Sequence, residues 1–323
     1  MMSIRGMLVA LALPLAWTAS AWAQFQKNEP AGAPQAETAV QRWKCGLIIT
    51  ASGGPCQRIV ATTPVPVDWP EQQVKIASED ISPSARVTYQ MVEGGVRQMT
   101  VTIAHLMPGQ EAKAVLTLEI HRTTLLPPEN PKRFQLPDVK KLDTKVRPYL
   151  GPSPFIESRN PKIIALAKQI SGEHAGAWAK VEAFHAWVRA HVKNEGGQIK
   201  GAMAALKDGT GDCEEMTCLF IALCRASGIP ARTVHLPGHC YPEFYLLDEQ
   251  DEGHWFPCET TSAQGFGGSP DKRPILEKGD NFKNPQKPRE HFHYLPEMVT
   301  GASLPGSAMP QIRTIRESLP GEG

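Results

Sequence analysis

The sequence predicts an α+β fold, with a β-sandwich followed by a mixed α/β domain. Between about residues 43 and 120, apolar residues alternate with polar ones at every second position, which is typical of half-buried strands. Between about residues 160 and 228 the apolar spacing is helical, and a strand pattern then continues to about Cys258. With 323 residues, 41% of them hydrophobic, the chain can fill about two domain cores.

The first 40 residues have the pattern of an export signal and a leader. Arg5 precedes an apolar run, and small residues end in Ala-Trp-Ala at position 23. The run is interrupted by proline and is shorter than the ~20 apolar residues that a membrane anchor needs. We therefore expect a cleavable signal peptide over residues 1–23 and a flexible leader over 24–40. The mature protein is expected to be secreted or periplasmic, without a transmembrane segment after cleavage.

A β-sandwich is predicted over residues 41–125. Its strands are marked by alternating apolar residues: Val87, Tyr89 and Met91; Met99, Val101 and Ile103; and Leu116, Leu118 and Ile120. Gly94-Gly95 and Pro108-Gly109 separate these runs, so turn residues fall where a meander requires them. Prolines recur from residue 127 to residue 154, and they predict a long ordered connection over 126–158.

The second domain is predicted over residues 159–275. Asn160-Pro161 is a helix cap followed by proline at the first helical position, and Gly172 ends that helix. A second run at helical spacing ends before Gly196. From residue 276 to 323, proline and polar residues dominate, so we expect a tail that is extended over the surface or disordered.

The candidate nucleophile lies in the segment GTGDCEEMTCLFIALCRASGIPAR, residues 209–232. Asp212 and Glu215 form a variant of the capping box, which makes Cys213 the first residue of a helix that Gly228 ends. The positive end of the helix dipole and the unpaired backbone N–H groups favour a thiolate. The same groups can receive a developing oxyanion, so this position suits a catalytic thiol.

A nucleophilic cysteine needs a base and a third group that orients the base. The segments HCYPEFYLL at 239–247 and HWFPCETT at 254–261 predict an antiparallel hairpin around an acidic turn. One register places His239 opposite Glu259 on one face and Cys240 opposite Cys258 on the other. We therefore expect His239 to be the general base, Glu259 to orient it, and Cys240 to form a disulfide with Cys258.

The cysteine count constrains the remaining thiols. Seven cysteines leave at least one free thiol in an oxidising compartment, and Cys213 is the natural candidate. Cys45 and Cys56 are expected to form a disulfide between neighbouring strands, and Cys218 and Cys224 to be buried and unpaired. A zinc site made of Cys and His residues is the alternative. The chain has no Cys-x-x-Cys pair, so we expect no metal and no cofactor.

Four segments together resemble the transglutaminase-like superfamily. The superfamily has four motifs that resemble G-x-G-D-C, R-A-x-G-I-P-A-R, H-A-W-x-E-x-Y-L and W-x-P-x-D-x-T. This chain has matching segments in the same order, at residues 209–213, 225–232, 239–246 and 255–261. The resemblance covers about residues 160–262. It implies a transglutaminase-like, papain-like α/β core in which Cys213, His239 and Glu259 correspond to the nucleophile, the base and the orienting acid.

The chain departs from this pattern at three positions. Glu259 stands where the family has Asp, and Tyr241 where it has Trp. Pro242 lacks the N–H group of a strand residue, which predicts an edge strand or a bulge beside His239. Arg232 and Glu243 match the pattern and are expected to support the core rather than to react.

Composition and motifs together predict an exported cysteine-dependent acyl-transfer enzyme. The chain has 34 Lys and Arg residues and 33 Asp and Glu residues, so it lacks the excess of positive charge that is typical of nucleic-acid-binding proteins. The expected partner is a peptide or protein substrate whose amide bond Cys213 attacks. The resemblance implies hydrolysis more often than crosslinking to a lysine amine. The alternative is a non-catalytic binding module of the cell envelope, which the departures at Glu259 and Pro242 motivate.

Overall fold

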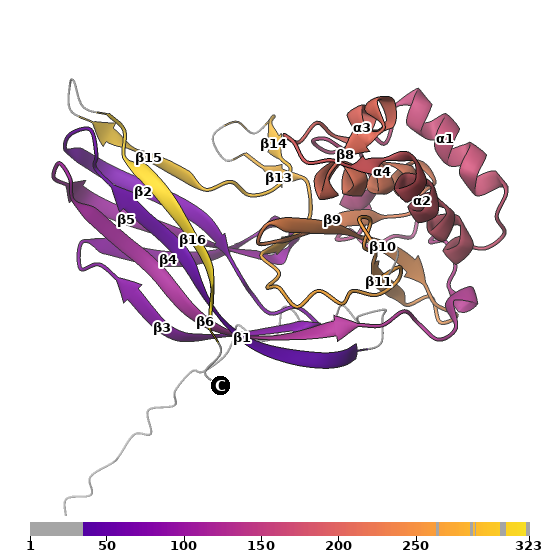
Figure 1. Cartoon of the computed structure of the whole chain (residues 1–323), viewed down its shortest axis with the longest axis horizontal. Coiled ribbons are helices and arrows are strands. Elements are labelled where there is room, and N and C mark those ends of the chain that lie inside the picture. Colours follow the sequence, from indigo (N-terminus) through magenta and orange to yellow (C-terminus); the bar gives the residue numbers. More distant parts are fainter. Residues whose placement is uncertain (1–34, 263–264, 285–286, 288, 304–307, 321–323) are drawn as a thin grey trace, which may run out of the picture.

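The computed structural model describes residues 35–262, 265–284, 287, 289–303 and 308–320. In this part of the chain a β-sandwich lies beside a mixed α/β lobe (Figure 1). The predicted signal peptide over 1–23 and residues 24–34 of the predicted leader lie outside the described residues. Residues 35–40 were also expected in the leader, but they form the beginning of the first strand.

Two four-stranded sheets make up the sandwich. Its strands are β1 Gln35–Thr50, β2 Cys56–Val65, β3 Gln72–Ile81, β4 Ala85–Val92, β5 Val96–Leu106, β6 Glu111–Leu125, β15 Met298–Ser303 and β16 Gln311–Leu319. The strand orders are β16-β1-β6-β3 and β15-β2-β5-β4. The predicted turns lie where expected, with Gly94 and Gly109 both at φ 76°, a conformation that glycine adopts without strain. The core between the sheets includes Leu47, Met99 and Leu116, each 0% exposed.

The segment after residue 276 differs from the tail that the sequence predicts. β15 pairs with β2 and β16 pairs with β1, so this segment extends both sheets of the sandwich, as Figure 1 shows in yellow. β16 is an edge strand, and Ile315 is its one buried residue. An edge strand that buries so little apolar surface has a polar sequence, which is why its pattern did not indicate a strand.

The second lobe combines four α-helices with a four-stranded sheet. The helices are α1 Pro161–Gly172, α2 Ala177–His191, α3 Ala202–Asp208 and α4 Cys213–Ala226. The strands are β9 Ala231–Leu236, β10 His239–Leu247, β11 Gly253–Pro257 and β12 Glu277–Lys278. Their order in the sheet is β11-β10-β9-β12. Every residue of α4 from Glu215 to Arg225 is buried. Packing on all sides therefore fixes the helix that begins at Cys213.

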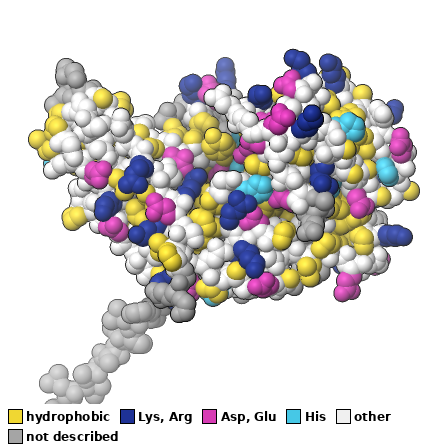
Figure 2. All heavy atoms as spheres, viewed as in Figure 1, with side chains coloured by type: hydrophobic (Ala, Val, Ile, Leu, Met, Phe, Trp, Pro, Cys, Tyr) yellow, Lys and Arg dark blue, Asp and Glu magenta, His cyan; other side chains and the backbone are white. Residues whose placement is uncertain are grey.

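Short elements complete the described chain. They are the 3-10 helices η1 Glu93–Gly95, η2 Pro131–Arg133 and η3 Arg147–Leu150, and the short strands β7 Lys193–Asn194, β8 Thr210–Gly211, β13 Phe282–Lys283 and β14 His291–Phe292. Among the described residues, none of the helices has the length and hydrophobicity to cross a bilayer. Lys and Arg side chains are interspersed with Asp and Glu over the face shown in Figure 2.

The β10–β11 hairpin has a different register from the one that the sequence predicts. Glu243 pairs with Pro257, and Leu247 pairs with Gly253, a shift of two residues. The turn is longer because the Asp248 carboxylate accepts the N–H groups of residues 250 and 252. β10 also lies between β11 and β9, so the edge position expected from Pro242 is wrong.

The two expected disulfides are absent, and all seven cysteines, which lie within the described residues, are free thiols. In the observed register Cys240 lies opposite His235 of β9 rather than opposite Cys258. Cys45 and Cys56 belong to strands of opposite sheets. Cys218 and Cys224 are both 0% exposed, in agreement with their predicted burial.

A buried ion-pair network joins the sandwich to the β11-β10-β9-β12 sheet. The Lys278 ammonium of β12 donates to Glu71 at 2.6 Å and to Glu243 of β10 at 2.7 Å, and Arg232 Nε donates to Glu243 at 2.9 Å. Burial would raise the pKa of Glu71, but the charges of Lys278 and Arg122 lower it to about 2. Arg232 and Glu243 are therefore structural groups, as expected, and they anchor the strand that begins at His239.

Replacing Lys278 with Met is expected to lower the free energy of unfolding by about 3–5 kcal/mol, because the Glu71 and Glu243 carboxylates would lose a buried partner. Lys283→Met is the matched control. Its ion pair with Glu93 is exposed, with side chains 67% and 50% accessible, so it should barely change stability. Urea denaturation of both variants measures the difference, and equal losses would contradict this account.

Candidate active site

The capping box places Cys213 at the start of α4. Asp212 Oδ1 accepts the backbone N–H of Glu214 at 2.8 Å, and the N–H of Asp212 donates to Glu215 Oε2 at 3.1 Å. Both halves of the predicted box are thus present. The thiol of Cys213 is half-buried at the helix N-terminus, where the macrodipole favours a negative charge.

His239 and Glu259 form the second contact of the site. His239 is the first residue of β10, and Glu259 follows the end of β11 by two residues. His239 Nε2 lies 2.8 Å from Glu259 Oε2, and the two side chains are 13% and 14% exposed. They are thus largely shielded from water but still accessible. The predicted partners meet although they do not oppose each other in the β10–β11 ladder, which pairs Glu243 with Pro257.

Two further residues hold Glu259 in place. Thr261 donates to Glu259 Oε1 from its hydroxyl at 2.7 Å and from its backbone N–H at 3.1 Å. His185 of α2 hydrogen-bonds through Nε2 to the Glu259 carbonyl oxygen at 2.8 Å. One carboxylate oxygen is therefore fixed by Thr261 while the other faces His239. Thr261 is the final residue of the W-x-P-x-D-x-T match, but the motif alone does not predict its contact with Glu259.

Cys240 also affects the candidate nucleophile. It follows His239 on β10, is fully buried, and lowers the pKa of the Cys213 thiol through hydrogen bonding. Burial raises the pKa of Cys240 well above its ordinary value, so this side chain is a neutral thiol donor. The expectation that Cys240 forms a disulfide is wrong, because it depends on a hairpin register that differs from the observed one by two residues.

The site favours a thiolate–imidazolium pair. The hydrogen bond from the Cys240 side chain outweighs burial, and together with the hydrogen bond to His239 it lowers the pKa of Cys213 to about 5. Burial would lower the pKa of His239, but the hydrogen bonds to Cys213 and Glu259 raise it to about 9. Between about pH 5 and pH 9 both groups are therefore charged.

An ion pair lies at the edge of this site. The Arg273 guanidinium donates to both carboxylate oxygens of Asp271 and, at 3.4 Å, to the carbonyl oxygen of Pro237. The hydrogen bond to Asp271 raises the pKa of Arg273, and the nearby charges of Glu259 and Cys213 act in the same direction. The Arg273 side chain is 38% exposed, so its positive charge faces solvent close to the thiolate.

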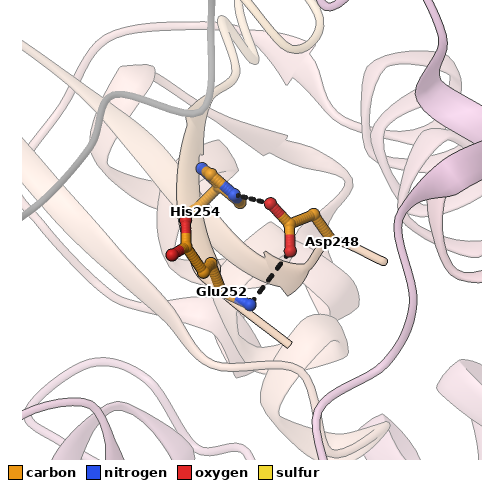
Figure 3. Close-up of side chains that lie close together, drawn as sticks. All are labelled: Asp248, Glu252 and His254. Carbon is orange, nitrogen blue, oxygen red and sulfur yellow. Dashed lines mark hydrogen bonds and ion pairs between the residues drawn. The ribbon is translucent and has the colours of Figure 1, made fainter. Parts of the chain in front are cut away.

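In the described part of the chain, three potential metal ligands gather at Asp248, Glu252 and His254, where their ligand atoms lie within 4.8 Å of one another (Figure 3). Asp248 Oδ2 binds His254 Nε2 at 2.7 Å, and Oδ1 accepts two backbone N–H groups of the turn. Both oxygens are thus engaged in closing the β10–β11 turn. These three residues lie at the opposite end of β10 from His239. The hydrogen bonds that close the β10–β11 turn account for their close approach.

One family model and several solved structures are similar to parts of this chain. Residues 164–260 match a family model described as the transglutaminase-like superfamily. A crystal structure of a candidate cysteine protease from Cytophaga hutchinsonii is similar, with 19% identity, a TM-score of 0.58, and coverage of 90% of this chain and 94% of that one. That likeness supports the fold. The periplasmic domain of TgpA from Pseudomonas aeruginosa, bound to ethylmercury, matches at 18% identity and a TM-score of 0.34, covering 71% and 77% of the two chains. No curated protein matches the chain significantly.

Proposed function

We propose that this chain, whose residues 164–260 match the family model of the transglutaminase-like superfamily, is an exported cysteine-dependent enzyme that hydrolyses amide bonds of peptide or protein substrates. The observation that carries the proposal is the 2.8 Å contact between His239 Nε2 and Glu259 Oε2, together with the Cys213 thiol at the start of α4, whose pKa His239 helps to lower. A thiolate, an acid–base imidazole and a carboxylate that orients it are the groups that acyl transfer through a thioester requires.

In the proposed reaction the Cys213 thiolate attacks the carbonyl carbon of the substrate amide. The His239 imidazolium then donates its proton to the leaving amine, which departs and leaves a thioester on Cys213. Neutral His239 next accepts a proton from water, and the resulting hydroxide displaces the thiolate and releases the carboxylic acid. Glu259 stays ionised and stabilises the imidazolium at both stages.

The start of α4 supplies a place for the negative charge that develops on the carbonyl oxygen. The Asp212 cap accepts the N–H of Glu214, so the N–H of Cys213 itself is available to an incoming oxygen. The helix dipole favours the same charge. We assign the Cys213 N–H as one oxyanion donor of the proposed reaction.

Two acceptors could resolve the thioester. Water needs no site beyond the accessible edge of His239, whereas a lysine side chain needs a groove of its own, and we therefore favour hydrolysis. The alternative of a non-catalytic binding module rested partly on Glu259 standing where the family has Asp. The 2.8 Å contact with His239 and the two hydrogen bonds from Thr261 support a working carboxylate instead.

The proposal is tested with an unfolded protein substrate and a labelled primary amine in the same reaction. Hydrolysis predicts new α-amino groups in the substrate with no incorporated label, and Cys213→Ala should form none. Incorporation of the amine together with ammonia release would instead identify a crosslinking enzyme. If the wild-type protein and Cys213→Ala are equally silent with every amide substrate tried, the binding module is favoured.

A further inference from the structure

His293 lies against the first turns of α4, and the proposed reaction does not use it. This residue directly follows β14 and is 3% exposed. Its Nε2 atom is 3.4 Å from Oε2 of Glu214, the residue after Cys213, and 3.9 Å from the sulfur of Cys218. The segment after residue 276, expected from its sequence to be a tail, therefore contacts the helix that carries the nucleophile.

Contacts on both nitrogens fix the His293 ring and indicate its protonation. Nδ1 lies 3.1 Å from the carbonyl oxygen of Pro154, and the ring packs edge-on with Phe155, with 5.7 Å between the ring centres and an angle of 89°. A carbonyl oxygen only accepts, so Nδ1 carries a proton. A carboxylate also only accepts, so Nε2, which faces Glu214, carries a second one. The geometry therefore indicates an imidazolium ion paired with a carboxylate.

The Glu214 carboxylate needs such a partner. Its Oε2 atom is buried, and it has no hydrogen bond within the part of the chain that the structure describes. Burial would raise the pKa of Glu214, but this pKa is lowered to about 2, and the contact with His293 contributes most to the lowering. The carboxylate is therefore ionised at neutral pH, one residue from the Cys213 thiol. Without a counter-charge it would disfavour a thiolate there, because like charges repel.

We propose that His293 is a positioning residue of the active site: it neutralises the Glu214 carboxylate, so that the positive end of the α4 dipole remains available to the Cys213 thiolate. Cys213 and Glu214 are the first two residues of α4, and the same dipole stabilises a negative charge on either of them. The pair with His293 compensates the second charge. This inference rests on the proposed role of Cys213 as the nucleophile.

Other titratable side chains around this pair are neutral or are paired with a cation. They are His235 of β9, Cys218 of α4, Cys240 of β10, Glu277 of β12 and Asp280. Burial lowers the pKa of His235 to about 4 and raises that of Glu277 to about 8. Burial also raises the pKa of both thiols well above their ordinary value. Arg225 pairs with Asp280 at 2.7 Å. Among the described side chains, His293 is therefore the cation that compensates Glu214.

His293→Asn separates this electrostatic role from packing. The amide nitrogen of Asn takes about the place of Nδ1, so the variant retains a donor for the Pro154 carbonyl and removes the group that faces Glu214. His254→Asn is the matched control. It also removes a histidine from a carboxylate contact, with Asp248 at 2.7 Å, but at the opposite end of β10 from the active site.

The experiment measures the rate of Cys213 alkylation by iodoacetamide as a function of pH in the full-length protein. His293→Asn should raise the midpoint of this profile by about one pH unit, because an uncompensated carboxylate then lies beside the thiol. In a Glu214→Gln background the same change should leave the midpoint where Glu214→Gln alone places it, since no carboxylate remains to be neutralised. His254→Asn should have the wild-type midpoint.

Two results would overturn the inference. One is an unchanged midpoint in His293→Asn, with folding verified by circular dichroism. The other is an upward shift of the same size in the Glu214→Gln background, which would mean that His293 acts independently of Glu214. If His293→Asn does not fold, His293→Gln replaces it, since it also lacks the charge and fills more of the space; its midpoint should move in the same direction.

The same profiles distinguish a failure of this inference from a failure of the proposed function. A wild-type midpoint near that of a free thiol, at about pH 8.5, would contradict the proposed activation of Cys213 itself. A low wild-type midpoint that does not depend on His293 would contradict only the role of His293. Alkylation needs no amide substrate, so neither result depends on finding one.

Discussion

The Cys213→Ala variant is expected to have no measurable amide-cleaving activity, and His239→Ala is expected to be slower than the wild-type protein by about 10²–10⁴-fold in kcat. The first change removes the atom that forms the thioester. The second removes the group that protonates the leaving amine and that stabilises the thiolate through a direct hydrogen bond. Both are measured as release of α-amino groups from a peptide substrate.

Cys224→Ala is the control for these variants. Cys224 is a buried cysteine on α4, near the C-terminal end of the helix, whereas Cys213 is at its N-terminus. Its truncation should lower stability through a small cavity but leave kcat near the wild-type value. Full activity in Cys213→Ala, or an equal loss in Cys224→Ala, would show that the cleavage does not pass through a Cys213 thioester.

Glu259→Asp is expected to reduce kcat by about 10²-fold, although Asp is the residue of the family pattern. Removing one methylene withdraws the carboxylate by about 1 Å from His239, and a misplacement of that size costs on this order. The backbone here fits the longer side chain, since Thr261 donates to one oxygen of Glu259 while His239 contacts the other. The measurement is kcat on a peptide amide for both proteins.

Glu249→Asp is the matched control, because it makes the same change at an exposed carboxylate in the β10–β11 turn. It should leave kcat unchanged. A gain of activity in Glu259→Asp would mean that the natural Glu impairs the site, and the binding-module alternative would then be favoured. A neutral effect would mean that the carboxylate does not position the imidazole.

Sequence patterns predicted features that depend on residues close together in the chain. The Asp212 box and the helix that follows it depend on residues within one turn, and the structure contains both. The predicted strands and the turns at Gly94 and Gly109 are also local features. Residues 209 to 261 likewise carried enough short motifs to select Cys213, His239 and Glu259 as a group.

The errors concern features that depend on distant parts of the chain. The hairpin register was off by two residues because the Asp248 side chain lengthens the turn, and Cys240 was consequently assigned to a disulfide. β15 and β16 pair with strands more than two hundred residues earlier, and such edge strands need few apolar residues. The Lys278 network joins three segments that no local pattern connects.

We expect hydrogen bonding from Cys240 and His239 to hold Cys213 as a thiolate. The most direct measurement is the rate of Cys213 alkylation by iodoacetamide as a function of pH, followed by mass spectrometry. Because the pKa of this thiol is lowered to about 5, the rate should rise through pH 5 and be constant near neutrality, and His239→Ala should move the midpoint upward. A midpoint near that of a free thiol, at about pH 8.5, in both proteins would contradict the account.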